Sequence, residues 1–217
     1  MQAEDLVYYL ALHFTSGIGS RRLLALYQYF DSAEKAFYAG AGELMNVPGF
    51  GRNTVESFVH DRGAALETAR AQIASLGGDL SIVTFYDNGY PEALKTTYAQ
   101  PPLLYVHGNA EILQEEKMIA IVGSRKTTDY GRRAAKEFAE EFAKENVTVV
   151  SGFAKGIDTV AHQAIFEAGG KTIAVLGSGV DVIYPSTNKQ LCFRRELNHP
   201  PPLKGRYSYR WGVFLEN

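Results

Sequence analysis

The sequence predicts an α/β fold, in which a parallel sheet follows an all-helical N-terminal module. Three short apolar runs, rich in β-branched residues, each end in glycine, as buried strands often do. They cover residues 119–123, 147–152 and 172–177. Between them, apolar residues recur at the 3.6-residue period of a helix, over residues 135–143 and again over 157–168. The order strand, helix, strand, helix, strand predicts parallel pairing with right-handed crossovers, which is a Rossmann-like unit.

The first 75 residues are predicted to be a helical domain, and residues 76–217 the Rossmann-like domain. Two stretches of the helical part resemble each other, Thr15–Arg22 and Asn46–Asn53, about 32 residues apart. Both place Gly-hydrophobic-Gly between helical segments and resemble the helix-hairpin-helix motif of SAM-like modules. Glycines let a backbone approach closely, and the following helix offers unpaired N–H groups to a phosphate. The alternative is a tight helical hairpin in which the glycines serve only the turn.

This comparison makes Gly49, Gly51 and Arg52 secondary candidates for DNA contact. A further helix is predicted over residues 61–78, ending at a glycine pair. Two strand-like runs follow, Leu80–Phe85 and Leu103–Val106. The Pro101-Pro102 pair cannot occupy a central strand, so this segment is expected to flank the sheet or to form its edge.

The composition is that of an ordinary globular protein, with 46% hydrophobic and 21% charged residues among 217. No apolar run approaches the ~20 residues of a membrane span, and acids stand where a signal peptide needs a basic start, so we expect a cytoplasmic protein without membrane contact. The single cysteine, Cys192, argues against a disulfide or a cysteine-based metal site. A net charge of −2 weighs mildly against nucleic-acid binding, but residues 189–217 carry six basic against two acidic residues.

The loops after parallel strands open on the carboxyl edge of the sheet, which we call the rim. Glycines there expose backbone N–H groups, Arg125 offers a planar fork for phosphate and Lys155 a second positive charge. The residues predicted to meet at the rim and to bind DNA are Gly123, Ser124, Arg125, Ser151, Gly152, Lys155, Gly156, Gly177 and Gly179.

The rim lacks the features of common nucleotide enzymes. It has no G-x-G-x-x-G turn, no acid at the end of the second strand and no P-loop, so neither a dinucleotide nor an NTPase site is predicted. Asp158 is interpreted mainly as a helix N-cap, and His162 mainly as a packed histidine, although the pair offers acid–base chemistry. Because no catalytic set or metal-ligand cluster accompanies them, we expect binding without catalysis and without a cofactor.

Three segments, in order and in spacing, resemble the DNA-processing protein A family, also called DprA or Smf. They are the GSR turn at 123–125, the SGFAKGID…AH segment at 151–162 and the GSGVDVIYP segment at 177–185, with YPEAL…PPLLYVHGN upstream. The resemblance covers roughly residues 80–192. It implies a single-stranded DNA-binding recombination mediator without established catalytic activity. Such proteins protect incoming DNA during natural transformation and help load the RecA recombinase past single-strand-binding protein, acting as homodimers.

The resemblance also implies that Lys204 and Tyr207 contribute a phosphate contact and a base-stacking ring, since they match the family pattern K-G-x-[FY]. The tail beyond about Arg194 departs from the family, so we expect the sheet to lack its last strands and to leave an edge prone to association. Two alternatives stay open. One is a Rossmann-like nucleotide-processing enzyme of the phosphoribohydrolase type, although its PGGxGTxxE segment is absent; the other is a degenerate, shortened family member.

Overall fold

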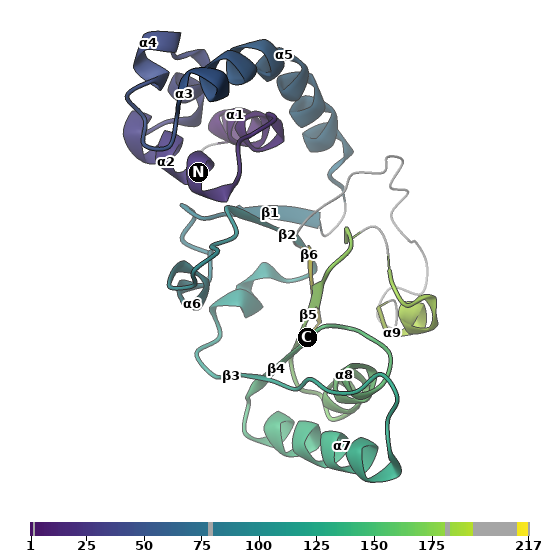
Figure 1. The fold of residues 1–217 in the computed structure, drawn as a ribbon. Helices are drawn as coiled ribbons and strands as arrows, with labels where there is room; N and C mark the ends of the chain where they lie inside the picture. Colours follow the sequence, from purple (N-terminus) through teal and green to yellow (C-terminus); the bar gives the residue numbers. More distant parts are fainter. Residues whose placement is uncertain (2, 78–79, 181–182, 193–211, 217) are drawn as a thin grey trace. The chain divides into compact units, whose positions relative to one another are not determined.

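The computed structural model describes residues 1, 3–77, 80–180, 183–192 and 212–216 (Figure 1). The chain divides into two compact units. The helical unit comprises Met1–Leu76, Thr84–Asp87 and Glu92–Pro102, and the sheet unit comprises Gly77–Val83, Asn88–Pro91 and Leu103–Asn217. Among the described helices, none combines the length and the apolar character that crossing a membrane would require.

The helical unit contains α1 (Ala3–Phe14), α2 (Ser20–Phe30), α3 (Ala33–Tyr38), α4 (Ala41–Leu44), α5 (Arg52–Ser75) and the short α6 (Glu92–Lys95). Helix α1 packs along α5 (Figure 1), and its residues Tyr9 to Leu12 are fully buried. Burial of this apolar face is the main favourable contribution to folding of such a unit. The predicted helical character of residues 1–75 is therefore confirmed.

The helix predicted over residues 61–78 is confirmed as far as Ser75, but it is not a separate helix. Helix α5 runs without interruption for 24 residues, from Arg52 to Ser75. It passes through Gly63, where a Cβ atom would meet nothing within 4 Å, so this glycine serves no packing purpose. A glycine in a helix interior costs only about 1 kcal/mol relative to alanine, and the packing of α5 against α1 outweighs that cost.

The sheet unit contains β1 (Leu80–Thr84), β2 (Leu103–His107), β3 (Met118–Ala120), β4 (Thr148–Ser151), β5 (Thr172–Leu176) and β6 (Gly212–Glu216), in the sheet order β1-β2-β6-β5-β4-β3. Strands β3, β4 and β5 pair in parallel, with Ile119 opposite Val149 and Val150 opposite Ile173. Helices α7 (Asp129–Lys144) and α8 (Ile157–Glu167) connect them and pack side by side (Figure 1). The predicted Rossmann-like unit is thus confirmed.

A small core joins these two helices to the sheet. It consists of Ala139 from α7, Val149 from β4, and Ala161, Ala164 and Ile165 from α8, all at most 3% exposed. Small residues on both helices allow them to approach each other and the strand closely. This core holds α7 and α8 against β4.

The sheet is mixed rather than wholly parallel. Strand β6 lies between β2 and β5, parallel to β2 but antiparallel to β5. The tail was expected to leave the sheet without its last strands, but Gly212–Glu216 pairs inside it. One edge of the sheet is β3, and all three of its residues are exposed. The other edge is β1, which agrees with the prediction that the segment containing Pro101-Pro102 flanks or edges the sheet. The remaining short elements are η1 (Ala110–Gln114), η2 (Ser186–Asn188) and α9 (Lys189–Cys192).

Candidate nucleic-acid interface

The loops after β3, β4 and β5 meet at the rim around one cavity of about 300 Å³. It is lined by Arg125, Gly152, Ala154, Lys155, Leu176, Gly177, Ser178 and Tyr184. Four of the residues predicted for the rim therefore come together: Arg125, Gly152, Lys155 and Gly177. Of the described residues that line the cavity, two are basic and none is acidic, so its local potential favours an anion.

The GSR turn is held in shape by its own side chains. The Ser124 hydroxyl donates to the Lys126 carbonyl at 2.7 Å and accepts from the Lys126 amide at 3.1 Å. The Thr128 side chain then caps α7 by accepting from the Gly131 amide at 3.1 Å. A turn closed in this way presents the Arg125 side chain to solvent at the start of the helix.

Gly156 allows the GSR turn and the loop after β4 to touch. Its φ angle is +96°, and a Cβ atom there would lie 2.3 Å from the Ser124 carbonyl oxygen and 2.9 Å from the Arg125 Cα. The Ile157 amide donates to the same Ser124 carbonyl at 3.3 Å. Only glycine combines this backbone angle with so close an approach. The contact places Lys155 beside Arg125 at the cavity.

Other predicted rim residues have structural partners. The Ser151 side chain is buried and donates to the Ile121 carbonyl at 2.6 Å, which ties β4 to the end of β3. A Cβ atom on Gly123 would lie 2.7 Å from Cγ1 of Ile157, so this glycine makes room for α8. Gly179 is buried, and Ser124 is exposed but does not line the cavity. Their roles in binding remain predictions.

Asp158 does not cap α8. The N-cap is Gly156, and Asp158 lies two residues later in the first turn, only 6% exposed. Its Oδ2 accepts from the Ala154 amide at 3.3 Å, which holds the loop after β4 against the helix. A carboxylate in the first turn is also stabilised by the helix dipole. Asp158 therefore stabilises the start of α8, as the sequence predicts, but it does so from the first turn of the helix. The cap position itself is occupied by Gly156.

His162 is a packed histidine. Its side chain is 2% exposed, its ring lies 5.4 Å from that of Phe153, and its Nδ1 lies 2.8 Å from the Thr172 hydroxyl. That hydroxyl donates to the Val149 carbonyl, so Nδ1–H is the donor to Thr172. Burial lowers the pKa of His162 to about 4, and a hydrogen bond with the Ser151 backbone offsets part of this effect. The histidine is therefore neutral at physiological pH and takes no part in the cavity.

Tyr184 is a site candidate that sequence reasoning did not single out. It lines the cavity beside the two cations, and it is 69% exposed. The signal that could have identified it is its place in the GSGVDVIYP segment, which follows the third predicted strand. An exposed aromatic beside cations is the combination on which unpaired bases stack. Lys204 and Tyr207 lie outside the described residues.

The two hairpin turns of the helical unit have the same local geometry. Gly17 and Gly49 have φ angles of +78° and +83°, the next residues Ile18 and Phe50 are buried, and the glycines that follow are the N-caps of α2 and α5. This agreement confirms the internal repeat. Neither first turn contains an acidic residue, and neither N-cap has a side-chain partner.

Arg22 joins the two turns. Its guanidinium donates to the Gly49 carbonyl at 2.9 Å and to the Gly17 carbonyl at 2.7 Å. Gly49, Gly51 and Arg52 are exposed in this arrangement. Within the described part of the chain, no group of histidine, cysteine and acidic side chains is arranged to hold a metal ion.

Comparison with known proteins agrees with the three motifs at the rim. The chain is 34% identical over 194 residues to Protein Smf of Synechocystis, which is 88% of this chain and 48% of that protein. It is 46% identical over 105 residues to the DNA processing protein DprA of Streptococcus pneumoniae, and 31% identical over 172 residues to that of Bacillus subtilis. These matches cover 36% and 55% of the two relatives, so the chain spans about half the length of the curated relatives it matches.

The fold agrees as well. The crystal structure of DprA from Streptococcus pneumoniae superimposes with a TM-score of 0.70 and 28% identity, over 96% of this chain and 66% of that one. The family model for DNA recombination-mediator protein A matches residues 81–198, more than half of the chain and the whole of the described rim. The chain therefore belongs to the DNA recombination-mediator protein A family.

Proposed function

We propose that this chain binds single-stranded DNA at the rim, with the backbone of the strand at Arg125 and Lys155 and a base on Tyr184. The observation that carries the proposal is the cavity itself, where two cations and an exposed aromatic meet over glycine loops. Proteins that hold single strands without reading their sequence combine a positive groove with aromatic stacking platforms.

The cavity suits part of a strand better than a free nucleotide. At about 300 Å³ it is at the small end of ligand cavities, and the described residues lining it include no acid that would bind a ribose hydroxyl. Arg125 can contact a phosphate with two parallel N–H groups, and Lys155 adds a point charge beside it. Strand binding of this kind needs no chemical step.

The wider role follows from the family. We propose that the chain acts as a recombination mediator that protects incoming DNA during natural transformation, and that it helps load RecA past single-strand-binding protein as a cytoplasmic homodimer. Membership of the family and the DprA relatives support this proposal. A binding rather than an enzymatic role also agrees with the neutral, buried state of His162.

The test is the salt dependence of binding to a fluorescent oligothymidylate, measured by anisotropy. Removal of one phosphate contact should make the log–log slope shallower by about 0.7. Arg125→Ala and Lys155→Ala should each do so and should weaken binding by about 1–3 kcal/mol, the range for a charge-assisted hydrogen bond. The matched control is Lys136→Ala on α7, an exposed lysine that does not line the cavity. Binding that is indifferent to salt, or equal losses in all three variants, would refute the proposal.

A further inference from the structure

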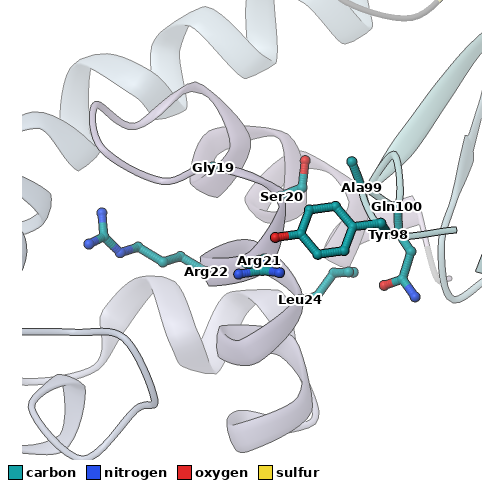
Figure 2. Close-up of a pocket in the computed structure, with 8 residues that line it drawn as sticks. All are labelled: Gly19, Ser20, Arg21, Arg22, Leu24, Tyr98, Ala99 and Gln100. Atoms are coloured by element: carbon teal, nitrogen blue, oxygen red, sulfur yellow. The ribbon is translucent and has the colours of Figure 1, made fainter.

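The helical unit has a second cavity that the proposed function does not use. It measures about 610 Å³ and lies between the start of α2, at Gly19–Leu24, and the segment Tyr98–Gln100, which follows α6 (Figure 2). Both segments belong to the helical unit. From this cavity we infer that the helical unit carries a separate contact for single-stranded nucleic acid, in which Tyr98 stacks an unpaired base and Arg21 binds the adjacent phosphate.

Tyr98 is an exposed ring held in a defined position. It is 89% exposed, more than any other large hydrophobic residue among the described ones. The Arg21 guanidinium carbon lies 5.0 Å from its ring centroid, a cation–π contact, and Figure 2 shows the two side chains next to each other. Arg21 contacts one side of the Tyr98 ring, and the rest of the ring is exposed to solvent.

The loop that carries Tyr98 is fixed by hydrogen bonds to α6. The hydroxyl of Thr96 donates to the Ala93 carbonyl at 3.0 Å, and that of Thr97 donates to the Leu94 carbonyl at 2.8 Å. The side-chain amide of Gln100 also donates to the Lys95 carbonyl. Because these bonds order the loop before a ligand arrives, stacking on Tyr98 costs little conformational entropy.

The charges around Tyr98 favour a polyanion. Arg22 lines the same cavity and adds a second positive charge. Its hydrogen bonds to the carbonyls of Gly17 and Gly49 hold the second hairpin turn against α2. The exposed Arg52 follows this turn. The first turns of α2 and α5 contain no acidic residue. Within the part of the chain that the structure describes, Arg21 forms no salt bridge, so its guanidinium is available to a phosphate.

These features favour a single strand over the other partners that a tyrosine and an arginine could serve. A ring can stack only on a base that is unpaired or splayed from its neighbours, which a duplex does not offer. A protein partner would be expected to bring carboxylates to the arginines, but it would not require a free ring face beside them. The inference rests on the proposed function only for the class of ligand, single-stranded nucleic acid. The residues of the two sites differ, because Tyr98 and Arg21 belong to the helical unit and the rim belongs to the sheet unit.

The experiment uses the full chain and an oligothymidylate with photoreactive iododeoxyuridine at defined positions. Irradiation followed by peptide mass spectrometry should place an adduct on Tyr98, and this adduct should persist in the Arg125→Ala/Lys155→Ala double variant. Tyr98→Ala should weaken binding measured by anisotropy by about fivefold to a hundredfold, the usual range for one stacked base, and Tyr98→Phe should retain it. Arg21→Ala should weaken binding and make the salt dependence shallower.

The matched control is Tyr29→Ala, which removes an exposed tyrosine that lies in α2 and does not line the cavity. Circular dichroism checks that each variant is folded. If adducts form only at the rim and Tyr98→Ala binds the oligonucleotide with unchanged affinity, this inference is overturned and the proposed function still stands. The same result is expected if the surface around Tyr98 binds a protein instead of a single strand. An adduct on Tyr98 without any at the rim would support the second contact and contradict the first.

Discussion

The buried histidine makes the stability of the sheet unit depend on pH. The His162 side chain is 2% exposed, and burial lowers its pKa from 6.5 to about 4. In the unfolded chain the same group binds a proton near pH 6.5, so between the two values the unfolded state holds more protons than the folded one. The contribution of His162 to the free energy of unfolding therefore falls as the pH drops through this window, and this contribution is constant above it.

The magnitude follows from the two pKa values. At about 1.4 kcal/mol per pKa unit, the difference between 6.5 and about 4 corresponds to about 3 kcal/mol once the pH is below both. Between pH 7.5 and pH 5.5, a range that is easily reached in experiments, His162 is expected to lower the free energy of unfolding by about 1.4 kcal/mol. This is a large part of the 5–15 kcal/mol that typically stabilises a domain.

Urea unfolding followed by circular dichroism at the two pH values measures this effect. His162→Gln keeps a polar group near Thr172 but cannot titrate, so the stability difference between wild type and variant should narrow by about 1.4 kcal/mol at the lower pH. The matched control is His60→Gln, which makes the same substitution at a histidine whose side chain is 87% exposed. A wild type–variant difference that stays constant from pH 7.5 to pH 5.5 would refute the reasoning.

Two further predictions concern the rim. Gly156→Ala should destabilise the sheet unit by about 1–3 kcal/mol and weaken single-strand binding, because a Cβ atom 2.3 Å from the Ser124 carbonyl forces the two loops apart. Gly177→Ala is the control for stability, since a Cβ atom there would meet nothing within 4 Å, and equal losses of stability in the two variants would contradict the steric argument. Tyr184→Ala should cost about 1–3 kcal/mol of binding measured by anisotropy, with little change in salt slope. Phe138→Ala, an exposed aromatic on α7, should cost nothing, and unchanged affinity in Tyr184→Ala would remove this ring from the site.

The rim was predictable because its position follows from chain order. Parallel strands joined by helices open their following loops on one edge of the sheet, so chain order alone predicts that Arg125 and Lys155 converge. The same logic did not reach Tyr184, because no hydrophobic period predicts that this exposed ring lines the cavity.

At two places the observed structure differs from the local sequence pattern, for a related reason. Gly77-Gly78 correctly marked the end of a helix, but the beginning of α5 was placed too late because its packing on α1 carries the helix through Gly63. Asp158 has the character of a cap residue, yet the close approach of the GSR turn assigns the cap position to Gly156. In both cases a tertiary contact outweighed a local preference of about 1 kcal/mol.

By itself, the sequence determined the helical and strand periods and the parallel pairing of β3, β4 and β5, because these follow from residue patterns and chain order. Only the tertiary structure decided that β6 pairs between β2 and β5, and that Tyr98 lies over Arg21 beside the first hairpin. Both are contacts between segments far apart in the chain. Their formation depends on packing across the whole unit, which no local pattern of residues encodes.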